Sequence, residues 1–269
     1  MSSGPRSVTL LTLLAFGFAF LYAPIVLLIV YSFNDSRLVT VWSGFSVKWY
    51  GELLRNEQML QAAWLSLRIA VVNATLAAVL GTMAGIVLAR YRRLRGYGLF
   101  AGLAAAPLVM PEVILGLSLL LLFVALENAI GWPAGRGAIT IIIAHVTFCM
   151  AYVAIIVQAK LAAFDDALEE AAADLGARPF TVFHAITLPL IAPAVIAGWL
   201  LAFTLSFDDL VIASFVSGPG ASTLPMVVYS SVRLGISPQI NALATLILVA
   251  ASILILTAAW LLRRRDKAG

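Results

Sequence analysis

Three acidic residues inside apolar runs are the part of this sequence best suited to chemistry. Asp208 and Asp209 are adjacent in one run, and Glu112 follows Pro107 and Pro111 in another. A charge inside a bilayer costs at least about 2.5–3.5 kcal/mol on insertion scales, so acids retained there indicate a functional site. The adjacent acids are ~100° apart around a helix, so one can face a central pathway while the other bonds a partner helix or the backbone. The alternative is that both lie at the outer membrane interface and are solvated.

The segment from 34 to 61 is a second candidate, because it is amphipathic and rich in aromatic residues: Trp42, Phe45, Trp49 and Tyr50. Aromatic faces can stack on a cationic substrate, and each contact contributes ~0.5–2 kcal/mol. A commoner role for tryptophan at a membrane boundary is an interfacial belt that anchors a surface helix. Both interpretations are open for this segment. We take Trp42 and Tyr50, together with Phe207 beside the acidic pair, as candidate binding residues.

A polar interval from 165 to 189, DDALEEAAADLGARPFTVFHAITLP, separates two long apolar runs. Asp166 and Glu169 have the spacing of a capping box, which predicts that a helix begins near Asp166. Alanines favour the continuation of this helix, and Gly176 can adopt the left-handed conformation that commonly ends one. The interval therefore predicts a short helix that ends in a glycine turn.

A second short helix is expected after that turn. Pro179 suits the first position of a helix, so this helix is expected to begin there. It should extend to Ile186, before Pro189 stops it. The resulting unit has an acidic first turn, an alanine surface and an apolar strip formed by Phe180, Phe183 and Ile186. Such a unit has too little apolar surface to fold alone, and it is suited to dock into a groove on another protein. His184 belongs to the same surface; the alternative is a helical hairpin without a partner.

The composition excludes an ordinary water-soluble protein. Hydrophobic residues make up 62% of the chain and charged residues only 11%, against about 25% charged in soluble domains. The 17 lysines and arginines are distributed among short loops, whereas a nucleic-acid interface requires a basic stripe with interleaved aromatic residues. The basic residues indicate orientation in a membrane and contact with lipid headgroups, and no nucleic acid is expected as a partner.

Six apolar runs are long enough to cross a bilayer, which requires roughly 20 residues. They predict an all-α polytopic membrane protein with six transmembrane helices in one domain, residues 1–269. The first run is too long for a secretory signal peptide, so it is interpreted as a retained span. With the N- and C-termini on the cytoplasmic side, most basic residues lie inside, as the positive-inside rule requires. The predicted spans are about 8–33, 62–90, 98–126, 138–159, 189–215 and 239–262.

Two pairs of glycines have the G-x-x-x-G spacing that lets membrane helices approach closely. Gly81 and Gly85 lie in the second span, and Gly98 and Gly102 open the third. These pairs predict helix packing and no chemistry.

Motifs for catalysis and for nucleotide binding are missing from the sequence. None of the three lysines follows a glycine, so there is no G-x-x-x-x-G-K-[ST] phosphate loop. Cys149 is the single cysteine, which excludes a disulfide framework and a multi-cysteine metal site. His145 is interpreted as a hydrogen-bonded interior histidine. We therefore predict no catalytic residue, no metal site and no cofactor bound by this chain.

The polar interval resembles the EAA loop of ABC-importer permeases. The pattern runs Glu170-Ala171-Ala172, three residues, Gly176, nine residues, Ile186, one residue and Leu188-Pro189, and every defining position is filled. In that family the loop contains the coupling helix, which sits in a cleft of the cytoplasmic ATPase. The resemblance implies that role for the residues Glu169, Glu170, Ala171, Ala172, Gly176, Phe180, Phe183, Ile186, Leu188 and Pro189.

Strings along nearly the whole chain are similar to permeases of polyamine importers, especially the second permease of the putrescine type. They include PLVMPEVILGLSLLLLFVAL, IAHVTFCMAYVA and SFDDLVIASFVSGPGASTLPMVVYSSVR. The resemblance implies a type I ABC importer permease in a bacterial inner membrane, paired as a heterodimer with a second permease. It also implies two copies of a cytoplasmic ATPase, which carries ATP and Mg, and a periplasmic solute-binding protein. Alternating access would then deliver a small di-cation past Asp208, Asp209 and Glu112.

Two alternatives stay open from the sequence. The substrate could be another small solute, such as spermidine, another cation, an amino acid or an iron complex. A secondary carrier is the other alternative, but that class should show inverted repeats with broken helices in both halves, which the sequence lacks.

Overall fold

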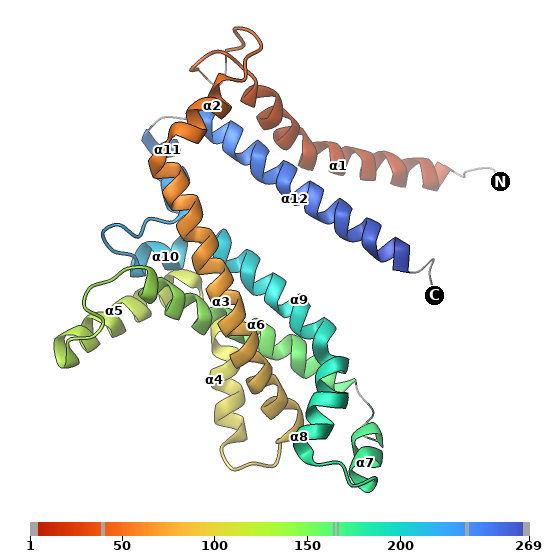
Figure 1. The fold of residues 1–269 in the computed structure, drawn as a ribbon. Coiled ribbons are helices and arrows are strands. Elements are labelled where there is room, and N and C mark those ends of the chain that lie inside the picture. Colours follow the sequence, from red (N-terminus) through yellow and green to blue (C-terminus); the bar gives the residue numbers. More distant parts are fainter. Residues whose placement is uncertain (1–4, 39–40, 164, 166, 235–236, 266–269) are drawn as a thin grey trace. The chain divides into compact units, whose positions relative to one another are not determined.

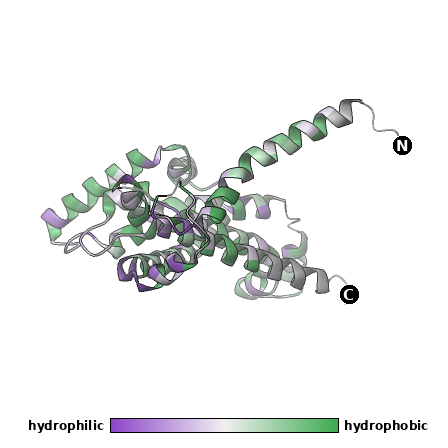
Figure 2. Ribbon diagram, turned by 90° about the horizontal axis from the view of Figure 1, so that it is seen from above, coloured by the Kyte–Doolittle hydropathy of each residue, from purple (hydrophilic) through white to green (hydrophobic). Residues whose placement is uncertain are grey.

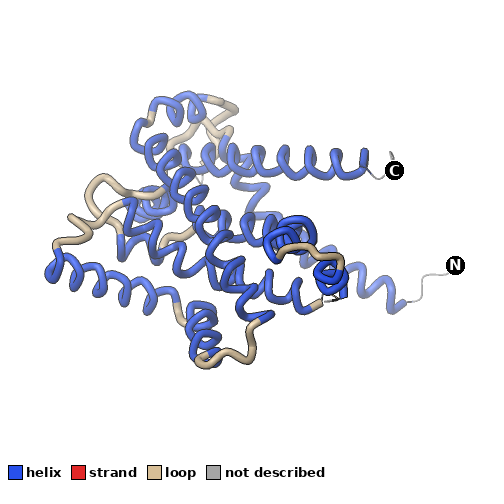
Figure 3. The backbone as a smooth tube through the Cα atoms, turned by 60° about the horizontal axis from the view of Figure 1, so that its bottom comes forward, coloured by secondary structure: helices blue, strands red, loops and turns tan. Residues whose placement is uncertain are grey.

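The computed structural model describes residues 5–265 apart from 39–40, 164, 166 and 235–236. Throughout these ranges the regular structure is helical (Figure 3), and the described β-structure is limited to an isolated bridge between Asn34 and Phe45. The all-α prediction is therefore confirmed. The helices (Figure 1) are α1 Pro5–Ser32, α2 Lys48–Arg55, α3 Glu57–Arg90, α4 Tyr97–Val109, α5 Glu112–Ile130, α6 Ala138–Ala162, α7 Ala167–Asp174, α8 Pro179–Val182, the π-helix η1 Phe183–Thr187, α9 Leu188–Phe207, α10 Val211–Val216, α11 Leu224–Leu234 and α12 Pro238–Arg265.

Five stretches of helix within the described residues are long and apolar enough to cross a membrane. They are Thr9–Ser32, Glu57–Arg90, Glu112–Ile130, Ala138–Ala162 and Pro179–Phe207. Two shorter apolar helices, Tyr97–Val109 and Pro238–Ile253, fall on the remaining parts of the six predicted runs.

The third predicted span, 98–126, is not one continuous helix. α4 ends at Val109 and α5 begins at Glu112, with Met110 in an extended conformation between them. Pro111 causes this break, because its ring disfavours a helical conformation at the preceding residue and its nitrogen has no hydrogen to donate. Pro107, in contrast, is accommodated inside α4.

The fifth predicted span, 189–215, is also divided, because α9 ends at Phe207 and α10 begins at Val211. Its start differs from the prediction as well: Pro189 does not stop the preceding helix. The chain passes from α8 through η1 into α9, and the amide of Leu188 bonds the carbonyl of Phe183, five residues back. This wider π turn lets the helix continue into Pro189, which occupies the first turn of α9.

The chain forms two compact units, residues 1–60 with 228–269 and residues 61–227, and each is described by itself. In the first unit α12 packs against α1 and α2. The loop after α1 is held at Asn34, whose carbonyl accepts the indole N–H of Trp49 at 2.6 Å and whose side-chain amide donates to the Val41 carbonyl at 2.7 Å. Lys48 pairs with Asp35 and holds the pKa of that carboxyl below its usual value, chiefly through the hydrogen bond.

The described side chains of α1 are mostly exposed. The colouring of Figure 2 shows that this helix is predominantly hydrophobic. A helix with this surface is suited to contact with lipid, because the bilayer replaces the protein core as its apolar surroundings.

The second unit is organised around the packing of α3 and α9 against α6. A Cβ atom at Gly81 would lie 2.6 Å from Cβ of Val153, and one at Gly85 would lie 2.7 Å from the carbonyl oxygen of Ala154. The first G-x-x-x-G pair therefore makes the predicted close approach. Gly98 and Gly102 have no atom within 4 Å of such a Cβ within the described chain, so the second pair does not.

Candidate functional site

The acidic pair lies at the interruption between α9 and α10, beside α6. The hydroxyl of Thr140 donates to the Val216 carbonyl at 2.7 Å, and Nε2 of His145 lies 3.1 Å from Oδ2 of Asp209. α10 therefore runs antiparallel to the first part of α6. His145 is seven residues into α6, about 10 Å along the helix axis. The interruption thus lies beside the second turn of α6 or beyond it, and not at the first residue of that helix.

The carboxylate of Asp209 forms hydrogen bonds with three residues of this chain. Besides His145, it accepts the backbone amides of Ile212 at 3.2 Å and Ala213 at 2.7 Å, which caps the first turn of α10. Nδ1 of His145 lies 2.7 Å from the hydroxyl of Ser206. Only 8% of the Asp209 side chain and 2% of the His145 side chain is exposed. His145 is thus the interior hydrogen-bonded histidine that the sequence predicted, and Asp209 is the acid that bonds a neighbouring helix and the backbone.

Asp208, in contrast, is exposed and directly follows the last residue of α9. Phe207 precedes it and ends a stacked series of rings: its centroid is 5.8 Å from that of Phe203, which is 5.5 Å from that of Trp199. Trp199 and Phe203 were not among the predicted site residues, although their spacing of four residues indicates neighbouring rings on one helix face.

Glu112 is exposed at the first position of α5, immediately after the break in the third span. α5 crosses α10 closely at Gly116, where a Cβ atom would lie 2.8 Å from the ring of Phe215 and 3.4 Å from Cα of Ile212. Glu112 comes four residues before Gly116, and Asp208 comes four residues before Ile212. Both exposed acids are therefore near one helix crossing along their respective segments.

Trp42 and Tyr50 belong to the first unit, whereas Phe207 and the acids belong to the second. Tyr50 bonds the hydroxyl of Ser32 at 2.7 Å and its ring packs on Phe33, so its position is fixed by α1. Trp42 is exposed and meets the edge of Tyr31. Trp49 is 3% exposed and is therefore a core residue of this unit.

The polar interval has the predicted helix, glycine turn and second helix. α7 begins at Ala167; the capping residue expected at Asp166 lies outside the described residues. Gly176 has φ of 81°, the left-handed conformation that favours glycine. The amide of Ala177 bonds the carbonyl of Ala172 at 3.0 Å, which closes the end of the helix.

The outward surface of the interval is more apolar than predicted. Leu175 is 89% exposed and Phe180 is 76% exposed, and Leu168 is exposed as well. Neither leucine was predicted as part of the surface, although each flanks the alanine run. The remaining predicted positions divide by burial: Glu170, Ala171, Gly176 and Pro189 are exposed, whereas Ala172, Phe183, Ile186 and Leu188 are partly covered.

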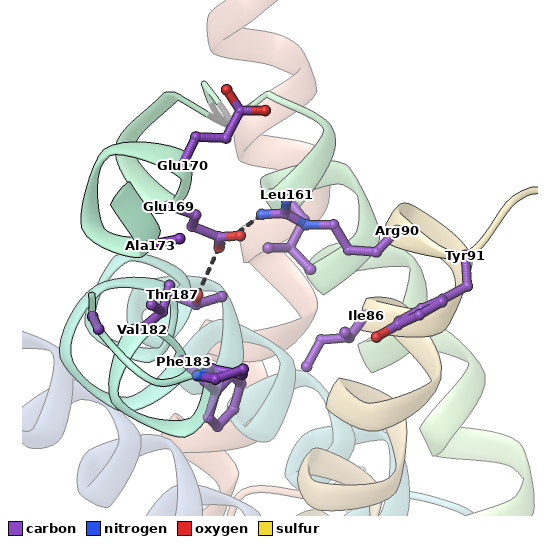
Figure 4. A pocket seen from close by; sticks show the side chains of 12 residues that line it. Ile86, Arg90, Tyr91, Leu161, Glu169, Glu170, Ala173, Val182, Phe183 and Thr187 are labelled. Atoms are coloured by element: carbon purple, nitrogen blue, oxygen red, sulfur yellow. Dashed lines mark hydrogen bonds and ion pairs between the residues drawn. The ribbon is translucent and has the colours of Figure 1, made fainter. Parts of the chain in front are cut away.

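The side chain of Glu169 points toward neighbouring helices, whereas that of Glu170 is exposed. Glu169 accepts hydrogen bonds from Arg90 at 2.8 Å and from Thr187 at 2.6 Å, both within this chain (Figure 4). Arg90 and Thr187 were not identified as site residues from the sequence, because they are 79 and 18 residues away from Glu169 along the chain.

Comparison with known proteins gives consistent matches. The family described as "Binding-protein-dependent transport system inner membrane component" matches residues 81–267. The "Putrescine transport system permease protein PotI" of Escherichia coli (strain K12) is 62% identical over 262 residues, covering 97% of this chain and 93% of that protein. The "Spermidine/putrescine transport system permease protein PotC" of the same strain is 43% identical over 250 residues, covering 93% and 92%.

Two solved structures share the fold. A chain of a bacterial ABC transporter involved in the import of the acidic polysaccharide alginate superimposes with a TM-score of 0.74 at 16% identity, covering 96% of this chain and 97% of that one. A chain of the MetNI methionine ABC transporter in an inward-facing conformation gives 0.60 at 18% identity, covering 74% and 92%. At these identities the likeness concerns the fold alone.

Proposed function

The chain belongs to the family of binding-protein-dependent transport system inner membrane components, and on that premise we propose that it is a permease subunit of a putrescine importer. The observation that carries the proposal is the 62% identity to the PotI permease across 97% of the chain. At that similarity, the interruption with its acidic pair and the polar interval are expected to have the same roles in both proteins.

Putrescine is a short di-cation, and its passage through a bilayer requires groups that offset its lost hydration. Asp208 and Glu112 are suited to this because both are exposed, next to helix breaks in apolar spans. Phe207 would contact the methylene stem beside Asp208. Trp42 and Tyr50 remain candidate cation contacts of the first unit, described by itself. Asp209 is already bonded to His145 and to α10, so its contribution would be to hold the interruption in shape.

The chain would act within an assembly of several subunits. A second permease would complete the pathway, and a periplasmic binding protein would deliver the substrate to the outer face. Two copies of a cytoplasmic ATPase would hold ATP and Mg, and each would receive one coupling helix. The exposed surface of α7 and α8, with Leu168, Leu175 and Phe180, is suited to such a cleft. This arrangement requires α7 and both termini to be cytoplasmic and the bundle to lie in the bacterial inner membrane.

Spermidine is a second candidate substrate, because the PotC permease, 43% identical to this chain, is named for both spermidine and putrescine. Spermidine is also a cation with a methylene backbone, so the same acids and rings would serve it. Competition between the two polyamines for uptake distinguishes the candidates.

The proposal is tested by co-expressing the chain with its second permease and ATPase and reconstituting the complex in liposomes. Putrescine-loaded binding protein should stimulate ATP hydrolysis and drive uptake of labelled putrescine. Uptake that is independent of ATP would favour a secondary carrier instead, and stimulation by another loaded binding protein alone would change the substrate.

A further inference from the structure

One oxygen atom of Glu169 connects three helical elements. Its Oε1 accepts a hydrogen bond from Nη2 of Arg90 and a second from the hydroxyl of Thr187. Arg90 is the last residue of α3, Glu169 belongs to α7, and Thr187 is the last residue of η1 (Figure 4). We refer to these three residues as the clamp.

Side-chain packing does little to hold α7 in place. No described side chain of α7 is fully buried. A hollow of about 540 Å³ lies beside the clamp, and apolar side chains such as Ile86, Leu161 and Phe183 line it without filling it. Figure 4 shows the two bonds at the edge of this space. Because packing is sparse here, the two bonds of Glu169 are a specific connection from α7 to α3 and η1.

The clamp is a strong connection for its location. The side chains of Arg90 and Glu169 are only 24% and 21% exposed, so water screens the ion pair less than it would at an open surface. Hydrogen bonds that involve a charged partner are also shorter and stronger than neutral ones. The distances of 2.8 and 2.6 Å agree with that description.

The clamp also has a continuous path to the acidic interruption. η1 passes directly into α9 without a cap, and α9 runs 20 residues to Phe207, immediately before Asp208. A helix of that length spans about 30 Å, and α9 stays continuous through Pro193. A π turn at its base is a local irregularity of the kind often found at functional sites. A displacement applied at Thr187 would therefore reach the interruption at the far end of α9.

We infer that the clamp passes movement of α7 to α3 and α9, so that Arg90, Glu169 and Thr187 are positioning residues for transport. The inference rests on the proposed function and deepens it. It separates two adjacent acids: Glu170 faces outward to the ATPase, whereas Glu169 faces inward to the bundle. Loss of the clamp should leave the ATPase docked and active while less substrate moves for each ATP consumed.

The test measures putrescine uptake and ATP hydrolysis on the same proteoliposomes containing the full complex. Thr187→Val removes the donor hydroxyl, and Thr187→Ser retains it. For Thr187→Val and Glu169→Gln, uptake per ATP should fall about 5-fold or more, the lower range of typical coupling energies. Thr187→Ser should keep the wild-type ratio. Glu127→Gln, at an exposed position of α5 outside the polar interval, is the matched control and should keep it as well.

A double variant isolates the ion pair. If Arg90 and Glu169 act together, Arg90→Gln combined with Glu169→Gln should lower the ratio no further than the worse single variant. A wild-type ratio in Thr187→Val and Glu169→Gln would overturn the clamp. Equal loss of uptake and hydrolysis, with loss of ATPase from the purified complex, would also overturn it, because the residues would then serve assembly. A wild-type complex without any uptake would instead refute the proposed function, and the clamp with it.

Discussion

Nε2 of His145 lies 3.1 Å from Oδ2 of Asp209, and the neighbouring Asp208 is exposed. Two adjacent carboxylates are thereby given different tasks by their surroundings. The buried one caps α10 and bonds α6, and the exposed one is accessible to a ligand. This difference yields predictions that separate substrate contact from stability.

Asp208→Asn should weaken uptake at low putrescine concentration by about 10-fold or more, because a hydrogen bond to a charged group contributes about 1.5–3 kcal/mol. The midpoint of its thermal unfolding should match that of the wild type, since Asp208 is exposed. The measurement is the concentration dependence of uptake in proteoliposomes. Unchanged uptake in Asp208→Asn would remove this acid from the pathway.

Asp209→Ala should instead lower the stability of the permease itself. The substitution leaves two amides of α10 and one nitrogen of His145 without their acceptor, and each unsatisfied buried group costs about 1–3 kcal/mol. The midpoint of thermal unfolding in detergent should fall clearly below that of Asp208→Ala. Equal midpoints for the two variants would contradict the different environments of the acids.

His145→Leu should destabilise the chain for the complementary reason, because it removes the partner of both Asp209 and Ser206. The expected loss is about 1–3 kcal/mol of unfolding free energy. His184 is exposed, so His184→Leu is the matched control and should leave the unfolding midpoint unchanged. Equal changes in the unfolding midpoint for the two substitutions would contradict this expectation.

The two glycine pairs give a test of packing. Gly81→Ala places a methyl group 2.6 Å from Cβ of Val153, and overpacking of this kind costs about 1–3 kcal/mol. Gly98→Ala and Gly102→Ala meet no atom of the described residues within 4 Å. The midpoint of thermal unfolding of the separately purified permease should therefore fall only for Gly81→Ala. A similar loss for Gly98→Ala would show a contact at that face.

The sequence predicted the elements of the fold well, because long apolar runs and proline or glycine positions depend on local physics. It was wrong at Pro189, which is absorbed after a π turn instead of ending its helix, because that outcome depends on the exact hydrogen bonding of the backbone. Whether a proline breaks a helix depends on the bonds available around it, and no residue pattern in this chain specified them.

The candidate site was predicted less completely than the fold. Asp208, Asp209 and Glu112 stand out because acids are rare in apolar runs, but their different environments required tertiary contacts. Asp209 is 64 residues from His145 along the chain, and Glu169 is 79 residues from Arg90. Pairings over such distances leave no local signal, so Glu169 was grouped with the outward-facing residues although it faces inward.

As proposed above, this chain moves a polyamine by using the ATP hydrolysis of a separate ATPase subunit. The most direct measurement is uptake of labelled putrescine by liposomes that contain the assembled complex, with and without ATP and the loaded binding protein. The account predicts uptake only when both are present, together with stimulated ATP hydrolysis. Uptake without ATP, or stimulated hydrolysis without any putrescine inside the liposomes, would contradict it.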